Sequence, residues 1–78
     1  MKGKTDGRDE RIGAAIRAAR ERRNMGQLDL GNAIGVSKVM ISRLEAGSYR
    51  LKVSTLLDIA TALRVPVGRL LRQGEIRR

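Results

Sequence analysis

The sequence contains no cysteine, histidine, tryptophan or phenylalanine, and its single aromatic residue is Tyr49. Without cysteine it can form neither a disulfide bond nor a thiolate metal site. Without histidine it lacks the commonest general base and the commonest metal ligand. These absences argue against an enzyme. We expect no metal, no other cofactor and no small-molecule substrate.

Charge is unevenly distributed between the two signs: 17 Lys and Arg stand against 8 Asp and Glu, a net charge of +9. This excess favours a polyanionic partner, nucleic acid first and an anionic membrane surface second. An apolar content of 41% is too high for a disordered basic tail. No uncharged stretch approaches the roughly 18 residues of a membrane-spanning helix, and the charged start is unlike a signal peptide. We therefore expect one small cytoplasmic domain without a membrane partner.

Apolar residues recur at helical spacing in five segments, with no alternating strand pattern between them. The expected helices span about residues 9–23, 27–34, 38–46, 54–64 and 66–71. Asp9, Ser37 and Ser54 are the expected N-caps, and Gly35 and Gly47 the expected C-caps. The sequence thus predicts an all-α domain over residues 9–71, between a flexible basic arm (1–8) and a basic tail (72–78).

The helices 27–34 and 38–46 are joined by a short turn containing Gly35, which is the helix-turn-helix pattern. On a helical wheel Ile41 and Leu44 share an inner face of the second of these helices. The outer face carries small side chains and a long donor, a combination that suits the DNA major groove, because the backbone can approach while the donor reaches base edges. The alternative is an ordinary solvated surface.

We predict base contacts from Lys38, Val39, Ser42 and Arg43. Arg43 is the first candidate to bind guanine, with Lys38 second, and Val39 could contact a thymine methyl group. The N-terminus of this helix, at Ser37, favours a phosphate because its N–H groups point outward.

Four pieces of sequence resemble the XRE-type (phage repressor and Cro) helix-turn-helix family at the family's own spacing. They are Gln27, Gly35-Val36-Ser37, Ile41-Ser42-Arg43-Leu44-Glu45-Ala46-Gly47 and Leu56-Leu57-Asp58-Ile59-Ala60. The resemblance covers about residues 9–71 and implies a five-helix repressor-like DNA-binding domain.

The resemblance also implies roles for single residues. Gln27 would bind a DNA phosphate and brace the recognition helix, and Arg20 would form a structural ion pair with Glu45. The loop after that helix would lie on the phosphate backbone through Arg50 and Lys52, unless these two are merely free surface charges.

The chain departs from the family pattern at several positions. Gly26 replaces the usual Ser or Thr, so the cap of the second helix should be weaker. Gly31 replaces the usual Ala, which would be tolerable where another helix approaches closely. Leu51 stands where proline is common and becomes a candidate dimer contact. Val39 and Met40 replace commonly polar residues, so sequence preference there must come from contact or DNA shape.

The leading expectation is a sequence-specific DNA-binding transcriptional regulator, a small repressor or autoregulating controller. It would bind a pseudo-palindromic double-stranded operator as a homodimer, because symmetry doubles the contacts of one small domain. The expected dimer interface is Leu51, Val67, Leu70 and Leu71, although the core must claim some of these residues.

The alternative is an antitoxin-type protein that binds a toxin, or another regulator, as well as its own promoter. The short stretch after Leu71 weakens this alternative, because wrapping a toxin needs an extra segment. Nonspecific binding to anionic surfaces would explain the charge, but not the spacing of the four sequence pieces.

Overall fold

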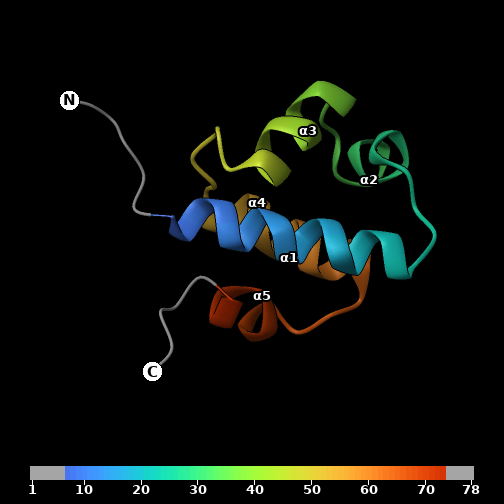
Figure 1. The fold of residues 1–78 in the computed structure, drawn as a ribbon. Coiled ribbons are helices and arrows are strands. Elements are labelled where there is room, and N and C mark those ends of the chain that lie inside the picture. Colours follow the sequence, from blue (N-terminus) through green and yellow to red (C-terminus); the bar gives the residue numbers. More distant parts are fainter. Residues whose placement is uncertain (1–6, 74–78) are drawn as a thin grey trace.

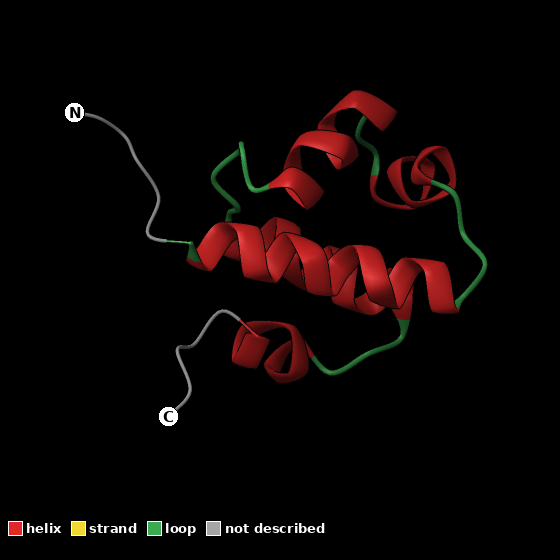
Figure 2. Ribbon diagram, in the orientation of Figure 1, coloured by secondary structure: helices red, strands yellow, loops and turns green. Residues whose placement is uncertain are grey.

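Five α-helices follow one another in the computed structural model, which describes residues 7–73 (Figure 1). They are α1 (Arg8–Arg22), α2 (Gln27–Ile34), α3 (Lys38–Ala46), α4 (Val53–Leu63) and α5 (Val67–Gln73). Between residues 7 and 73 the chain contains no strand (Figure 2), and the expected all-α fold is confirmed. Most of the expected arm and tail lies outside the described residues.

The start of α1 differs from the expectation by one residue. The helix begins at Arg8, and Gly7 takes the N-cap position in the left-handed conformation, with φ of 89°. Asp9 therefore lies in the first turn and is not the cap. Its negative charge still suits a helix N-terminus, where the peptide dipoles leave partial positive charge.

The expected cap of α4 is wrong. Lys52 holds the N-cap position with extended backbone, and its carbonyl oxygen accepts from the N–H of Leu56 at 2.9 Å. Ser54 is thus the second residue of the helix, and no side chain caps α4. At the other end of the chain α5 continues to Gln73 and so includes Arg72, which we expected in the tail.

The caps around the helix-turn-helix are those expected. The Ser37 hydroxyl oxygen accepts from the N–H of Met40 at 3.0 Å, which satisfies one free donor of the first turn of α3. Gly35 and Gly47 end α2 and α3 with φ of 80° and 78°, a conformation that costs glycine little. Gly26 lacks a side chain to cap α2, but the Asp29 carboxylate accepts from its N–H at 2.8 Å.

Helix α1 lies at the centre of the domain, with α3 on one side and α5 on the other (Figure 1). All five helices contribute to one hydrophobic core, whose fully buried large side chains are Ile16, Leu30, Ile41, Ile59, Leu63 and Leu70. Two faces of α1 are therefore occupied in different ways. One supports the helix-turn-helix, and the other is covered in part by α5.

The crossing of α1 and α3 is closer than ordinary side chains allow. A Cβ atom on Gly13 would lie 2.5 Å from the carbonyl oxygen of Glu45, and one on Gly47 would lie 2.6 Å from Cα of Glu10. Backbone therefore meets backbone where α3 ends. Sequence reasoning missed Gly13, although a glycine inside a helical pattern is itself a signal of close approach.

Gly31 has a different neighbour from the one expected. A Cβ atom there would lie 2.6 Å from the carbonyl oxygen of Val36, in the turn between α2 and α3. The backbone of the turn approaches Gly31, not another helix. The N–H of Val36 also donates to the carbonyl oxygen of Gly31 at 2.9 Å, so the turn folds back tightly onto α2.

Candidate nucleic-acid interface

A buried ion pair holds α3 to α1. Arg20 Nε donates to Glu45 Oε2 at 2.6 Å and Nη2 donates to Oε1 at 3.1 Å, a bidentate geometry. The third guanidinium nitrogen, Nη1, donates to the carbonyl oxygen of Met25 at 2.7 Å. The two side chains are only 8% and 4% exposed. Arg20 therefore joins α1, the loop before α2, and the end of α3.

The charge of this arginine is secured by its partner. Hydrogen bonding to Glu45 raises the pKa of Arg20 above its ordinary value, although burial opposes the rise, and the negative charges of Glu45 and Glu21 add to it. The guanidinium is thus fully ionised whenever the protein is folded at ordinary pH.

Gln27 joins the same network from the start of α2. Its Nε2 donates to Glu45 Oε1 at 3.1 Å, and its side chain is partly buried. The amide carries two N–H donors, so one remains for another acceptor. The structure thus places Gln27 as a direct link between the beginning of α2 and the end of α3.

This network changes the electrostatics of α3. Glu45 is the only acidic residue of the helix, and Arg20 neutralises it within the fold. The charges that α3 shows to solvent are therefore those of Lys38 and Arg43, and both are positive. Such a surface attracts a polyanion without local repulsion.

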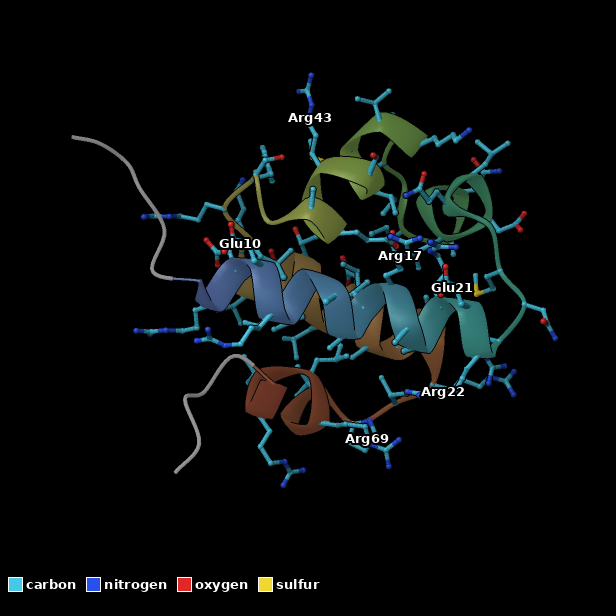
Figure 3. All side chains as sticks on the ribbon, in the orientation of Figure 1. Glu10, Arg17, Glu21, Arg22, Arg43 and Arg69 are labelled. Atoms are coloured by element: carbon cyan, nitrogen blue, oxygen red, sulfur yellow. The ribbon has the colours of Figure 1, made fainter. Side chains whose placement is uncertain are left out.

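The outer face of α3 is arranged as the wheel predicted. Ile41 and Leu44 are buried in the core, whereas Val39 is 57% exposed. Lys38, Ser42 and Arg43 are also exposed, and Arg43 projects from α3 away from α1 (Figure 3). An exposed valine between cationic side chains contributes apolar surface where the helix would meet a partner.

The loop between α3 and α4 begins from a fixed point. The N–H and the hydroxyl of Ser48 both donate to the carbonyl oxygen of Arg43, at 3.0 and 3.3 Å. Arg50 and Lys52 follow, both exposed, with Lys52 also at the N-cap of α4. The cations of the loop are thereby tied to the same helix end as Arg43.

The matching family is decided by one comparison. The helix-turn-helix family model matches residues 16–70, which runs from α1 into α5. The chain belongs to the XRE-type helix-turn-helix family of DNA-binding transcriptional regulators.

Relatives and solved structures agree with that assignment. An HTH-type transcriptional regulator of Mycobacterium tuberculosis is 42% identical over 59 residues, which are 76% of this chain and 23% of the relative. The clp gene regulator ClgR of Corynebacterium glutamicum superposes with a TM-score of 0.81 at 28% identity, over 86% of this chain and 87% of that one.

The P22 c2 repressor, solved in complex with a synthetic operator, has a TM-score of 0.74 at 34% identity, covering 80% of this chain and 94% of that one. The present chain spans about a quarter of the length of the mycobacterial relatives it matches. The resemblance therefore concerns the helix-turn-helix domain.

One expected dimer residue of this XRE-type domain is a core residue instead. Leu70 is 1% exposed and packs in the hydrophobic core, because the inner side of α5 must cover α1. Leu51 and Val67 are partly buried against that core, whereas Leu71 is 47% exposed.

Sequence reasoning missed two other exposed apolar side chains near the expected dimer surface. Val53 and Leu57 are 74% and 47% exposed and stand one helical turn apart on α4. An amphipathic pattern could have revealed them, because their spacing differs from that of the buried residues of α4.

Within residues 7–73 no three acidic side chains gather as a metal ligand set, and no helix has the length and apolarity to cross a bilayer.

Proposed function

We propose that this domain is a sequence-specific transcriptional regulator, of the repressor type, which binds a pseudo-palindromic DNA operator as a homodimer. The observation that carries the proposal is the outer face of α3. It is exposed, it bears Lys38 and Arg43 beside the apolar Val39, and its one acid is neutralised inside the fold. That combination suits a helix inserted in the major groove.

Specific contacts would come from the four outward residues of α3. Arg43 can bind guanine O6 and N7 with two donors, and Lys38 can reach the same acceptors from the edge of the helix. Val39 can contact a thymine methyl group, and the Ser42 hydroxyl can add a polar contact. The operator half-site should therefore contain a G·C pair and a neighbouring T·A pair.

Phosphate contacts would surround this face. The second N–H of Gln27 and the N-terminus of α3 at Ser37 lie at the start of α2 and α3, where helix dipoles favour an anion. Arg50 and Lys52 would hold the backbone on the other side. Such contacts position the protein and do not read bases.

The dimer would form through apolar surface near α5. Leu51, Val67 and Leu71 remain candidates, and Val53 and Leu57 extend the exposed apolar surface of α4. Two subunits related by a twofold axis would bind two half-sites and double the contacts of one small domain.

Selection of bound sites from random DNA tests the whole proposal. We expect an inverted repeat whose half-sites are centred about 10 base pairs apart, since recognition helices of such dimers lie about 34–36 Å apart. A single asymmetric motif would refute the homodimer, and enrichment of no motif would refute sequence-specific binding.

Arg43→Ala should weaken binding to the selected operator by about 1–3 kcal/mol and relax the preference at one base pair of each half-site. Arg50→Ala is the matched control, because it also removes one exposed arginine. It should weaken cognate and random DNA about equally and lower the salt dependence by about one counterion per contact. Fluorescence anisotropy on both duplexes measures this. Equal losses for Arg43→Ala on the two duplexes would remove its role in base recognition.

Leu71→Asp should raise the dimer dissociation constant by about tenfold or more, because a buried carboxylate would replace apolar contact. Sedimentation equilibrium measures the constant. Leu28→Asp makes the same change at a leucine of α2 that is 56% exposed and outside the proposed interface. An identical effect of the two substitutions would show that Leu71 is not at the interface.

A further inference from the structure

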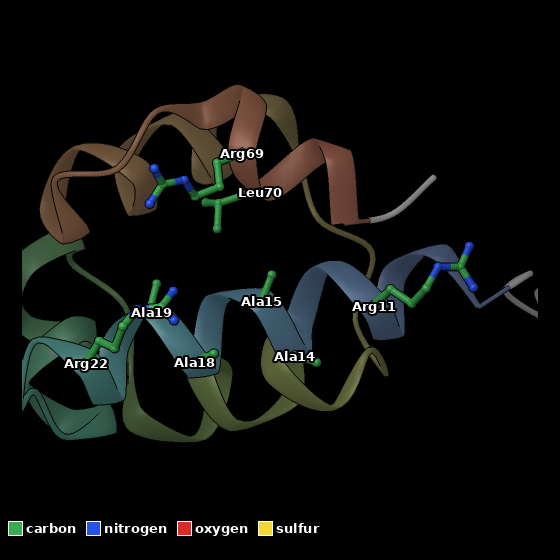
Figure 4. Close-up of a pocket in the computed structure, with 8 residues that line it drawn as sticks. All are labelled: Arg11, Ala14, Ala15, Ala18, Ala19, Arg22, Arg69 and Leu70. Carbon is green, nitrogen blue, oxygen red and sulfur yellow. The ribbon is translucent and has the colours of Figure 1, made fainter. Parts of the chain in front are cut away.

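A groove separates α1 from α5 on the side of α1 that faces away from α3 (Figures 1 and 4). Its volume is about 380 Å³. It is lined by Arg11, Ala14, Ala15, Ala18, Ala19, Arg22, Arg69 and Leu70. The DNA-binding proposal uses none of these residues except Leu70, which the core already holds.

The floor of the groove consists of small apolar side chains. The four alanines belong to α1, and two of them, Ala14 and Ala18, are exposed to solvent. Leu70 closes the wall on the α5 side. Short side chains on a helix allow another backbone to come close, and anchors spaced along a helix can then enter such a groove.

Both ends of the groove are positively charged. Arg11 stands at one end, and Arg22 and Arg69 stand together at the other (Figure 4). Arg22 and Arg69 are exposed, and neither forms an ion pair within residues 7–73. The lining contains no acidic residue. The groove therefore pairs an apolar floor with uncompensated positive charge at its rim.

We propose that this groove docks an acidic amphipathic helix of a partner protein. Arg11 and Arg22 are eleven positions apart on α1, which corresponds to about 16 Å or three helical turns. A ligand of that length, with an apolar stripe and acidic residues at both ends, would match the floor and the rim together. Charge complementarity of this kind supplies specificity and speeds association.

A second copy of this chain is a poor occupant, because its net charge of +9 would oppose a rim of arginines. DNA is also a poor occupant, since the floor is apolar. The groove and α3 lie on opposite sides of α1 (Figure 1). The partner helix and DNA could thus be bound at the same time, and this proposal does not depend on the operator proposal.

The probe is an 18-residue helical peptide with leucines along one face and glutamates near both ends, titrated into the full chain and followed by anisotropy. We expect binding that weakens about tenfold or more when glutamine replaces the glutamates. The double variant Arg22→Glu/Arg69→Glu should weaken binding by a similar factor. Amide shifts in ¹⁵N spectra should map to α1 and α5.

The matched control is Arg23→Glu/Arg72→Glu, which changes the net charge equally at two exposed arginines outside the groove. It should retain most of the binding. Ala18→Leu adds bulk at an exposed helical position and should also block the peptide. Circular dichroism confirms that each variant is folded.

Absence of binding, equal losses in the two double variants, or amide shifts confined to α3 would each overturn the proposal. Stronger groove-dependent binding to phosphatidylglycerol vesicles than to the peptide would overturn it in favour of a membrane. DNA affinity measured in parallel distinguishes the two proposals, because a failed peptide result with intact DNA binding concerns the groove alone.

Discussion

Arg20→Ala is expected to destabilise the domain by about 3–5 kcal/mol, because it leaves Glu45 as a buried carboxylate without its counterion. The substitution also removes the donor that Met25 accepts from. A chain of this size has only about 4–12 kcal/mol of total stability. Thermal unfolding followed by circular dichroism should show a melting temperature lower by about 12 °C or more.

Arg17→Ala provides the control within the same helix. Arg17 also pairs with a glutamate, Glu21, at 3.1 Å, but the two side chains are 65% and 55% exposed. Exposed pairs contribute little, so this variant should unfold within a few degrees of the parent. Equal melting temperatures for the Arg20 and Arg17 variants would show that the buried pair does not stabilise the fold.

A double variant separates the pair's net contribution from the cost of stranding one charge. Arg20→Met/Glu45→Met removes both charges and keeps apolar volume. It should be more stable than Arg20→Ala, because replacing a whole buried pair by apolar groups is often nearly neutral.

The pH dependence of this contribution follows from the raised pKa of Arg20. A group whose pKa is higher in the folded state contributes stability that is fully present below its ordinary pKa. That contribution is lost only as the pH rises through the raised value. The loss of melting temperature in Arg20→Ala should therefore be unchanged between about pH 6 and pH 10.

Gly47→Ala is expected to cost about 2–5 kcal/mol for two separate reasons. The residue has φ of 78°, where an L side chain costs about 1–2 kcal/mol. The new Cβ would also lie 2.6 Å from Cα and 2.8 Å from N of Glu10, so the backbone of α1 or α3 must move. Overpacking of this kind costs about 1–3 kcal/mol. Urea unfolding measures the sum.

Gly35→Ala isolates the first of these two costs. Gly35 ends α2 with φ of 80°, yet a Cβ there meets nothing within 4 Å. This variant should lose only the cost of the left-handed conformation, about 1–2 kcal/mol. The difference between the two variants then reports the contact of α3 with α1. No difference would mean that the crossing relaxes freely.

The helices and the outward face of α3 were predictable because their signals are local. Apolar spacing, the Ser37 cap and the left-handed glycines at 35 and 47 each act within a few residues, so they are legible without knowing the tertiary structure. The wheel therefore placed Arg43 outside and Ile41 inside correctly. The start of α4 was misjudged for a related reason, since Lys52 caps it by backbone conformation alone.

Contacts between distant segments were not predictable in the same way. Arg20 and Glu45 are 25 positions apart, and only the family resemblance pointed to their pairing. Nothing in the sequence showed that Gln27 would donate to the same carboxylate, or that α1 would come close enough to α3 to require glycine at 13.

The sequence by itself determined the number and type of helices, the positive charge and the face of α3 that is free to meet DNA. Only the tertiary structure decided that Leu70 fills the core while Leu71 stays exposed, and that arginines border a groove between α1 and α5. The physical reason is that helix formation depends on residues within about four positions of one another. The buried side of a short helix depends on which neighbour it packs against.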